Sequence, residues 1–225
     1  MTTTPPPSPP PPHRVESTPP AGPLARALSR AWLWFFGWKI EGSVPPSIRA
    51  VAIAYPHTSN WDLPFMLAIA YRMGIRPSWL GKRQIFRKPF GRFMRWLGGI
   101  PVDRSKSTNM VGQVVERFGE IDRLFLVIPP SATRHKAAHW KSGFYHIARG
   151  ANVPILLTFL DYSRKVGGIG PALMPTGDVH ADMDAIRAFY QGIQGRYPEN
   201  QTPIYLPEED PPKARAAGGG AGPRS

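Results

Sequence analysis

Apolar residues between positions 50 and 206 fall into two alternating kinds of segment. Short, nearly unbroken apolar runs are typical of buried strands, whereas longer segments with apolar residues every three or four positions are typical of helices. Their alternation along the chain is the pattern of an α/β domain. The expected strands are 50–55 (AVAIAY), 124–128 (LFLVI) and 153–162 (VPILLTFLDY), and the expected helices are 63–72, 89–97, 110–121, 140–149 and 182–195.

A different pattern precedes this region, in the sequence LARALSRAWLWFFGW at positions 24–38. Leu24, Leu28 and Trp32 recur at helical spacing, and two arginines share another face. The segment is shorter than the ~20 residues needed to cross a bilayer, but it suits a helix that lies in the membrane interface. Alternatively its aromatic residues pack onto the domain, and both can hold for different faces. The expected membrane contacts are Trp32, Trp34, Phe35, Phe36 and Trp38, with Arg87, Lys88 and Arg92 further along the chain.

Arg87, Lys88 and Arg92 belong to residues 81–99 (GKRQIFRKPFGRFMRWLGG), where Lys and Arg are interleaved with Phe and Trp. Charges that meet anionic head groups and rings that meet acyl chains make up membrane-facing surfaces of this kind. Nucleic-acid binding uses the same residue types, but it explains none of the motifs described below. We therefore expect an anionic membrane lipid surface as a partner, and no nucleic acid.

The two ends of the chain differ in composition from the rest. Residues 1–22 are rich in Pro, Thr and Ser, and residues 207–225 are rich in Pro, Gly, Ala and charged residues. Such segments bury too little apolar surface to offset the entropy of ordering, so both are expected to be disordered tails. Residues 23–39 then form the interface helix, and residues 40–206 form one catalytic or binding domain.

Charge and cysteine content narrow the classes of function. The 28 Lys and Arg exceed the 15 Asp and Glu by 13 charges, which favours anionic partners such as phospholipid head groups or phosphorylated substrates. The chain has no cysteine, which excludes disulfides, thiolate nucleophiles and Cys-ligated metal sites. With no secretory signal pattern, we expect the protein at the cytoplasmic face of the cell membrane, held peripherally or monotopically.

The sharpest chemical signal is the sequence HTSNWD, which runs from His57 to Asp62 between an expected strand and an expected helix. A carboxylate bonded to one imidazole nitrogen fixes the tautomer and leaves the other nitrogen free to take a proton from a hydroxyl. The alternative is that Asp62 or a neighbour caps the helix and that His57 is an ordinary loop residue.

Three further motifs follow in order: GGIPVDRS (98–105), IPPSATR (128–134) and VPILLTFLDY (153–162). Together with PHTSNWD (56–62), they resemble the conserved blocks of the glycerolipid acyltransferases, the family of lysophosphatidate and glycerol-phosphate acyltransferases. The resemblance covers residues 40–206. It implies a single α/β domain with a mixed central sheet flanked by helices.

The resemblance also implies roles for individual residues. His57 is the general base and Asp62 its orienting partner, while Arg104 contacts an acceptor phosphate and Gly99 permits close approach of the backbone. The third block departs from the family's PEGTR pattern, since Ser131 replaces the glutamate and Ala132 the glycine, so the acceptor can differ from glycerol phosphate. The remaining implied substrate contacts are Ser131, Thr133, Arg134 and Lys141.

The function implied is transfer of a fatty acyl group from acyl-CoA or acyl-carrier protein to the hydroxyl of a lysophospholipid-like acceptor. No permanently bound cofactor is expected. Metal binding is not expected either, since His135, His139 and His146 match no compact ligand spacing. The alternative is a non-catalytic membrane lipid-binding protein that has kept the fold.

Overall fold

The computed structural model describes residues 21–45, 49–102 and 107–210. Within these ranges, seven strands form one sheet in the order β1-β7-β6-β2-β5-β3-β4. Neighbouring strands are parallel except β6 and β7, which are antiparallel, so the expected mixed sheet is confirmed. The strands are β1 (Lys39–Glu41), β2 (Arg49–Ala54), β3 (Ser78–Lys82), β4 (Gly99–Val102), β5 (Leu124–Ile128), β6 (Ile155–Asp161) and β7 (Val166–Leu173).

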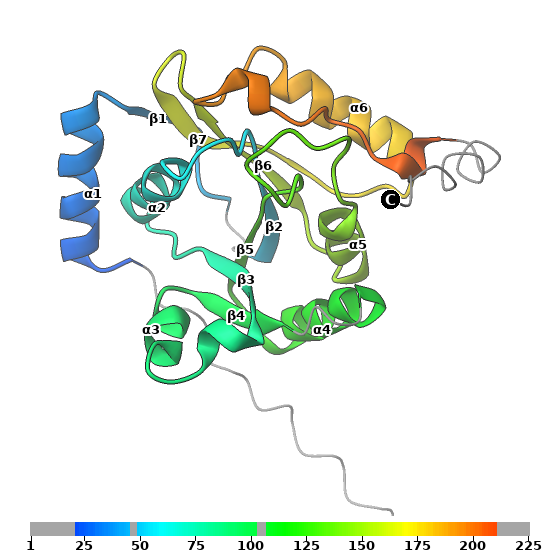
Figure 1. Ribbon diagram of the computed structural model, residues 1–225, viewed down its shortest axis with the longest axis horizontal. Coiled ribbons are helices and arrows are strands. Elements are labelled where there is room, and N and C mark those ends of the chain that lie inside the picture. Colours follow the sequence, from blue (N-terminus) through cyan, green and yellow to red (C-terminus); the bar gives the residue numbers. More distant parts are fainter. Residues whose placement is uncertain (1–20, 46–48, 103–106, 211–225) are drawn as a thin grey trace, which may run out of the picture.

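Helices cover both faces of the sheet (Figure 1). On one face lies α2, with α1 packed against it, and the other face is covered by α4, α5 and α6. The short α3 lies beside β4. No helix in the described ranges is long and apolar enough to cross a bilayer. The helices are α1 (Pro23–Phe36), α2 (Asp62–Arg72), α3 (Gly91–Trp96), α4 (Ser107–Glu120), α5 (Gly143–Gly150) and α6 (Val179–Tyr190), with short 3-10 turns η1 (Arg83–Phe86), η2 (Pro198–Asn200) and η3 (Pro207–Glu209).

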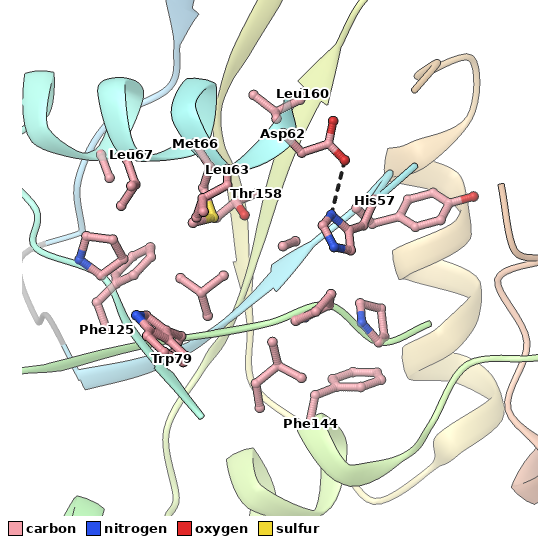
Figure 2. A pocket seen from close by; sticks show the side chains of 18 of the residues that line it. His57, Asp62, Leu63, Met66, Leu67, Trp79, Phe125, Phe144, Thr158 and Leu160 are labelled. Atoms are coloured by element: carbon pink, nitrogen blue, oxygen red, sulfur yellow. Dashed lines mark hydrogen bonds and ion pairs between the residues drawn. The ribbon is translucent and has the colours of Figure 1, made fainter. Parts of the chain in front are cut away.

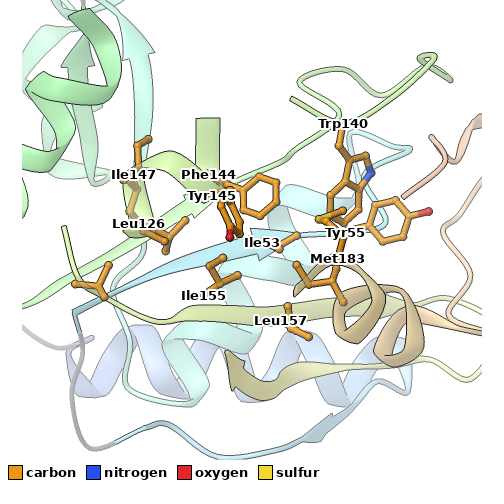
Figure 3. Close-up of a cluster of buried hydrophobic side chains, with 14 of the residues drawn as sticks. Ile53, Tyr55, Leu126, Trp140, Phe144, Tyr145, Ile147, Ile155, Leu157 and Met183 are labelled. Carbon is orange, nitrogen blue, oxygen red and sulfur yellow. The ribbon is translucent and has the colours of Figure 1, made fainter. Parts of the chain in front are cut away.

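The largest apolar cluster fills the space between the sheet and α4 to α6 (Figure 3). Ile53 of β2 lies in it beside Phe144 of α5, and fully buried side chains of this size each stabilise the fold by roughly 1.5–3 kcal/mol. Tyr55 packs edge to face on Trp140 with ring centroids 4.9 Å apart. This contact fixes the chain two residues before His57.

Four strands differ from the expectation: β1, β3, β4 and β7 were not predicted. In β7, a Cβ on Gly168 would lie 1.9 Å from the carbonyl oxygen of Glu41, and one on Gly170 would lie 2.3 Å from the Phe189 ring. These glycines therefore allow β7 to pack closely against β1 and α6. Their low strand propensity also hides the strand in the sequence.

The C-terminal boundary also differs from the expectation. The chain remains structured at 207–209 as η3, where Glu209 accepts a 2.7 Å hydrogen bond from Arg187 of α6. The remainder of the expected tails, residues 1–20 and 211–225, lies outside the described residues.

Candidate active site

The carboxyl ends of three parallel strands meet at one edge of the sheet. β2 leads into His57, β5 leads into the IPPSATR turn, and β6 leads into Tyr162. Ligands of open α/β sheets bind in the crevice outside the carboxyl ends of the strands. Sequence segments about 100 residues apart thus contribute side chains to the same edge.

His57 and Asp62 are in direct contact at this edge (Figure 2). The Nδ1 atom of His57 lies 3.1 Å from Oδ2 of Asp62. The same oxygen accepts the backbone N–H groups of Thr58 and Ser59 at 2.9 and 3.0 Å. Asp62 is 5% exposed and begins α2, and its carboxylate turns back into the preceding loop. It therefore organises this loop and holds the imidazole at the same time.

The contact assigns the two ring nitrogens of His57. Because an ionised carboxylate only accepts hydrogen bonds, the proton between the two groups lies on Nδ1. Nε2 is left with a lone pair, and His57 lines a large cavity. The arrangement has the geometry of a general base oriented by a carboxylate.

A third residue completes the contacts of Asp62 and was not predicted from the sequence. The Tyr162 hydroxyl donates a 2.8 Å hydrogen bond to Oδ1 of Asp62. Burial and then the charge of Asp62 raise the pKa of Tyr162 above its usual range, so the hydroxyl remains a donor. Its position as the last residue of the expected strand 153–162 is the one signal that the sequence offers.

The cavity beside His57 has a volume of about 840 Å³ and a mainly apolar lining. It extends from His57 and Asp62 to Leu67 and Phe125 at the opposite end (Figure 2). Cavities of this size hold ligands much larger than a head group. An apolar interior with a base at one end suits a long apolar chain whose reactive group stays at the polar end.

The predicted substrate-binding residues separate into two groups. Arg134 and Lys141 line the cavity. Ser131 is buried and donates its hydroxyl to the carbonyl oxygen of Thr133 at 2.8 Å, and Thr133 Oγ1 accepts the N–H of His135. Neither Ser131 nor Thr133 is among the residues that line the cavity, and their hydrogen bonds shape the turn that carries Arg134.

The block GGIPVDRS (98–105) contains two further predicted substrate contacts, Gly99 and Arg104. A Cβ on Gly99 would lie 2.7 Å from the Phe86 ring and 2.8 Å from the carbonyl oxygen of Met94. Gly99 therefore permits the close approach of neighbouring protein atoms. Arg104, the predicted phosphate contact, lies outside the described residues.

The aromatic residues at the N-terminal helix divide between two faces. Trp34 and Phe35 are 81% and 75% exposed. Trp38 is buried and packs on Phe65, and Trp32 and Phe36 also lie against the domain. The outward position expected for Trp38 is thus corrected to a core position, because its ring fills the space beside α2.

The remaining cationic positions behave as surface residues. Arg87, Lys88 and Arg92, expected at a membrane, are all exposed.

The histidines that the structure describes do not gather into a metal site. Nδ1 of His139 contacts the carbonyl oxygen of Trp140, and Nε2 of His146 lies 4.0 Å from Oε1 of Glu208. Within the described ranges, no group of three or more His, Asp or Glu side chains is placed to hold a metal ion.

Comparisons with known proteins agree with this geometry. Residues 39–157 match a family model described as acyltransferase. A 1-acyl-sn-glycerol-3-phosphate acyltransferase of Haemophilus influenzae is 29% identical over 153 residues, an alignment that covers 64% of this chain and 62% of the relative. The chain thus matches less than two thirds of that relative's length.

A solved structure shows the same fold. The crystal structure of the 1-acyl-sn-glycerophosphate acyltransferase PlsC of Thermotoga maritima matches with a TM-score of 0.53 and 15% identity, over 77% of this chain and 80% of that one. The family match spans more than half of the chain and includes His57 and Asp62. The chain therefore belongs to the acyltransferase family, and the resemblance to glycerolipid acyltransferases found in its sequence motifs is confirmed.

Proposed function

We propose that this protein transfers a fatty acyl group from an acyl thioester to the hydroxyl of a lysophospholipid-like acceptor. The donor is acyl-CoA or acyl-carrier protein, and the acceptor is 1-acylglycerol-3-phosphate or a related lipid. The observation that carries the proposal is the His57–Asp62 contact at one end of a large apolar cavity. This pairing provides a base for the hydroxyl and space for an acyl chain within one site.

The reaction requires one base and no covalent enzyme intermediate. Nε2 of His57 takes the proton of the acceptor hydroxyl as its oxygen attacks the thioester carbonyl carbon, while Asp62 stabilises the imidazolium that forms. The tetrahedral intermediate then collapses as the carbon–sulfur bond breaks. The proton held by His57 passes to the departing thiolate, which leaves the free thiol, the new ester and neutral His57.

The acceptor class is inferred from charge at the cavity. Arg134 and Lys141 line it, and cationic side chains of this kind bind phosphate oxygens. The family's glutamate is absent from the turn, where Ser131 is already bonded within the protein. The positive charge of Arg134 is therefore not offset by a carboxylate at position 131, which favours an acceptor with an anionic head group.

We further propose that the protein acts at an anionic membrane surface. Leu24, Leu28 and Phe35 project from one exposed face of α1. On α3, Phe93 and Trp96 are also exposed, among the basic residues of 83–95. Exposed apolar patches flanked by cationic residues suit lipid surfaces that offer both acyl chains and negative charge. Met94 and Leu97, on the inner side of the same segment, line the cavity.

The direct test is product analysis by intact lipid mass spectrometry, with purified full-length protein, acyl-CoA or acyl-carrier protein, and a panel of lysolipids. We expect acylated product with anionic lysolipids, and a kcat/KM at least ~1000-fold lower for His57→Ala with unchanged circular dichroism. His139→Ala, a histidine outside the site, should retain activity. Lipid binding without transfer from any donor would instead favour the non-catalytic alternative.

A further inference from the structure

We propose that Tyr162 is a positioning residue of the site, which acts through Asp62 to orient His57. This inference rests on the proposed function, because it assigns a role within the same catalytic site. Tyr162 directly follows β6, whereas His57 lies in the loop after β2 and Asp62 at the start of α2. The two segments are 100 residues apart in sequence.

The hydrogen bonds of Asp62 divide unequally between its two oxygens. Oδ2 accepts from His57 and from the two backbone N–H groups of Thr58 and Ser59. Oδ1 accepts from the Tyr162 hydroxyl at 2.8 Å. Because a carboxylate is planar, a donor fixed on Oδ1 determines the direction in which Oδ2 points. Tyr162 therefore limits rotation of the group that holds the imidazole.

Tyr162 is itself held from two sides. Its backbone N–H donates to the carbonyl oxygen of Gln194 at 2.9 Å. Its ring meets Trp38 edge to face at 5.0 Å and Phe65 at 6.0 Å, measured between centroids. A hydroxyl on a ring fixed in this way costs little additional entropy to keep in place. Such preorganised support is what a catalytic side chain requires to stay within productive geometry.

The role of Tyr162 is distinct from that of a base. Burial, followed by the charge of Asp62 and the hydrogen bond to it, raises the pKa of Tyr162. Its hydroxyl therefore remains protonated at neutral pH, and its proton is directed at Asp62. Tyr162 therefore does not exchange protons with the substrate.

The test is Tyr162→Phe in the full-length chain, which removes the hydroxyl and keeps the ring. We expect kcat to fall roughly tenfold, the value of one net hydrogen bond, with little change in KM for either substrate. Without the hydrogen bond from Tyr162, less of the negative charge of Asp62 would be neutralised. The carboxylate would then stabilise the imidazolium of His57 more strongly. The acid limb of the pH profile of kcat should therefore move to higher pH.

Tyr145→Phe is the matched control, since Tyr145 donates a 2.7 Å hydrogen bond to the buried Asp182 away from the dyad. It should lower the melting temperature without moving the pH profile. If Tyr162→Phe kept the wild-type kcat and profile, or changed only the melting temperature as the control does, the positioning role would be overturned.

A second readout separates this inference from the proposed function. The ring protons of His57, identified by their loss in His57→Gln, can be titrated by NMR without any turnover. We expect the titration midpoint in Tyr162→Phe to lie above that of the wild type. An inactive wild type that still shows this difference would overturn the proposed reaction alone, and equal midpoints would overturn the role of Tyr162.

Discussion

Trp38 stacks on Phe65, with ring centroids 4.4 Å apart and an angle of 22° between the ring planes. Trp38 follows the end of α1, and Phe65 lies in the first turn of α2, three residues after Asp62. The N-terminal helix is thus joined to the helix that carries the dyad's carboxylate. The face of α1 opposite this contact is the one that remains exposed.

Trp38→Ala should be strongly destabilising. Truncation of a buried tryptophan removes its apolar contacts and leaves a cavity, which costs about 3–5 kcal/mol of unfolding free energy. Urea denaturation followed by circular dichroism measures the difference. Trp34→Ala is the matched control, because Trp34 is 81% exposed and its loss should change stability by less than about 0.5 kcal/mol. Equal losses for the two variants would contradict the burial described for Trp38.

The exposed side of α1 should bind lipid. Replacement of both Trp34 and Phe35 by Ser should weaken sedimentation with anionic phosphatidylglycerol vesicles by at least ~10-fold, because large apolar side chains would no longer enter the interface. Met174→Ser, at another exposed apolar position, should bind as the wild type does. If the double variant kept full binding, α1 would not be the anchor.

The cations of the cavity should act on acceptor affinity. Arg134→Ala and Lys141→Ala should each raise KM for a phosphate-bearing lysolipid by about tenfold, with a smaller effect on kcat, since lost charge-assisted hydrogen bonds weaken binding before they affect proton transfer. Lys136→Ala removes a nearby exposed charge that does not line the cavity and should change neither constant. A larger effect at Lys136 would place the phosphate elsewhere.

Chain-length preference should depend on the far end of the cavity. Ala70 lines it and packs in the same cluster as Phe125. Ala70→Leu adds about three carbons there and should shift the preferred acyl thioester to shorter chains, as measured by competition among donors of different length. Ala181→Leu, on the exposed face of α6, should leave the preference unchanged. An unaltered preference in Ala70→Leu would show that the chain lies elsewhere.

Alkaline unfolding should depend on Tyr145. Burial and then its hydrogen bond to Asp182 raise the pKa of Tyr145 from 10.0 to about 12. Between these two pH values the folded state keeps the Tyr145 proton, whereas the unfolded chain loses it. The stabilisation of the folded state by this group is therefore complete below pH 10 and is lost as the pH rises towards 12. Urea denaturation at pH 9 and 11 should show Tyr145→Phe losing less stability than the wild type over this interval.

Sequence patterns predicted the parts of the site that are local in the chain. His57 and Asp62 are five residues apart across a strand-to-helix turn, so their contact could be expected from that spacing. Tyr162 could not be expected, because its contact depends on β6 lying beside β2 in the sheet. Strand order is set by tertiary packing that no short motif records.

Two strands were concealed by the composition of their segments. β3 (SWLGK) has mixed polarity and overlaps the basic aromatic segment, whose residues suggested a surface. Trp79 of this strand instead lines the cavity. β7 is rich in glycine because its neighbours leave no space for side chains. In both cases tertiary packing outweighs the local preference of the residues.

The dyad and the cavity's cations come from different loops, one after β2 and the other after β5. The hydrogen bonds of Asp62 involve no residue of the IPPSATR turn. Within that turn, Ser131 stands where the family has glutamate and donates to the carbonyl oxygen of Thr133. In the proposed reaction, proton transfer and head-group recognition are thus assigned to separate segments of the chain. If the proposed roles hold, substitutions after β5 would diversify the accepted lipids during evolution while the residues after β2 stay unchanged.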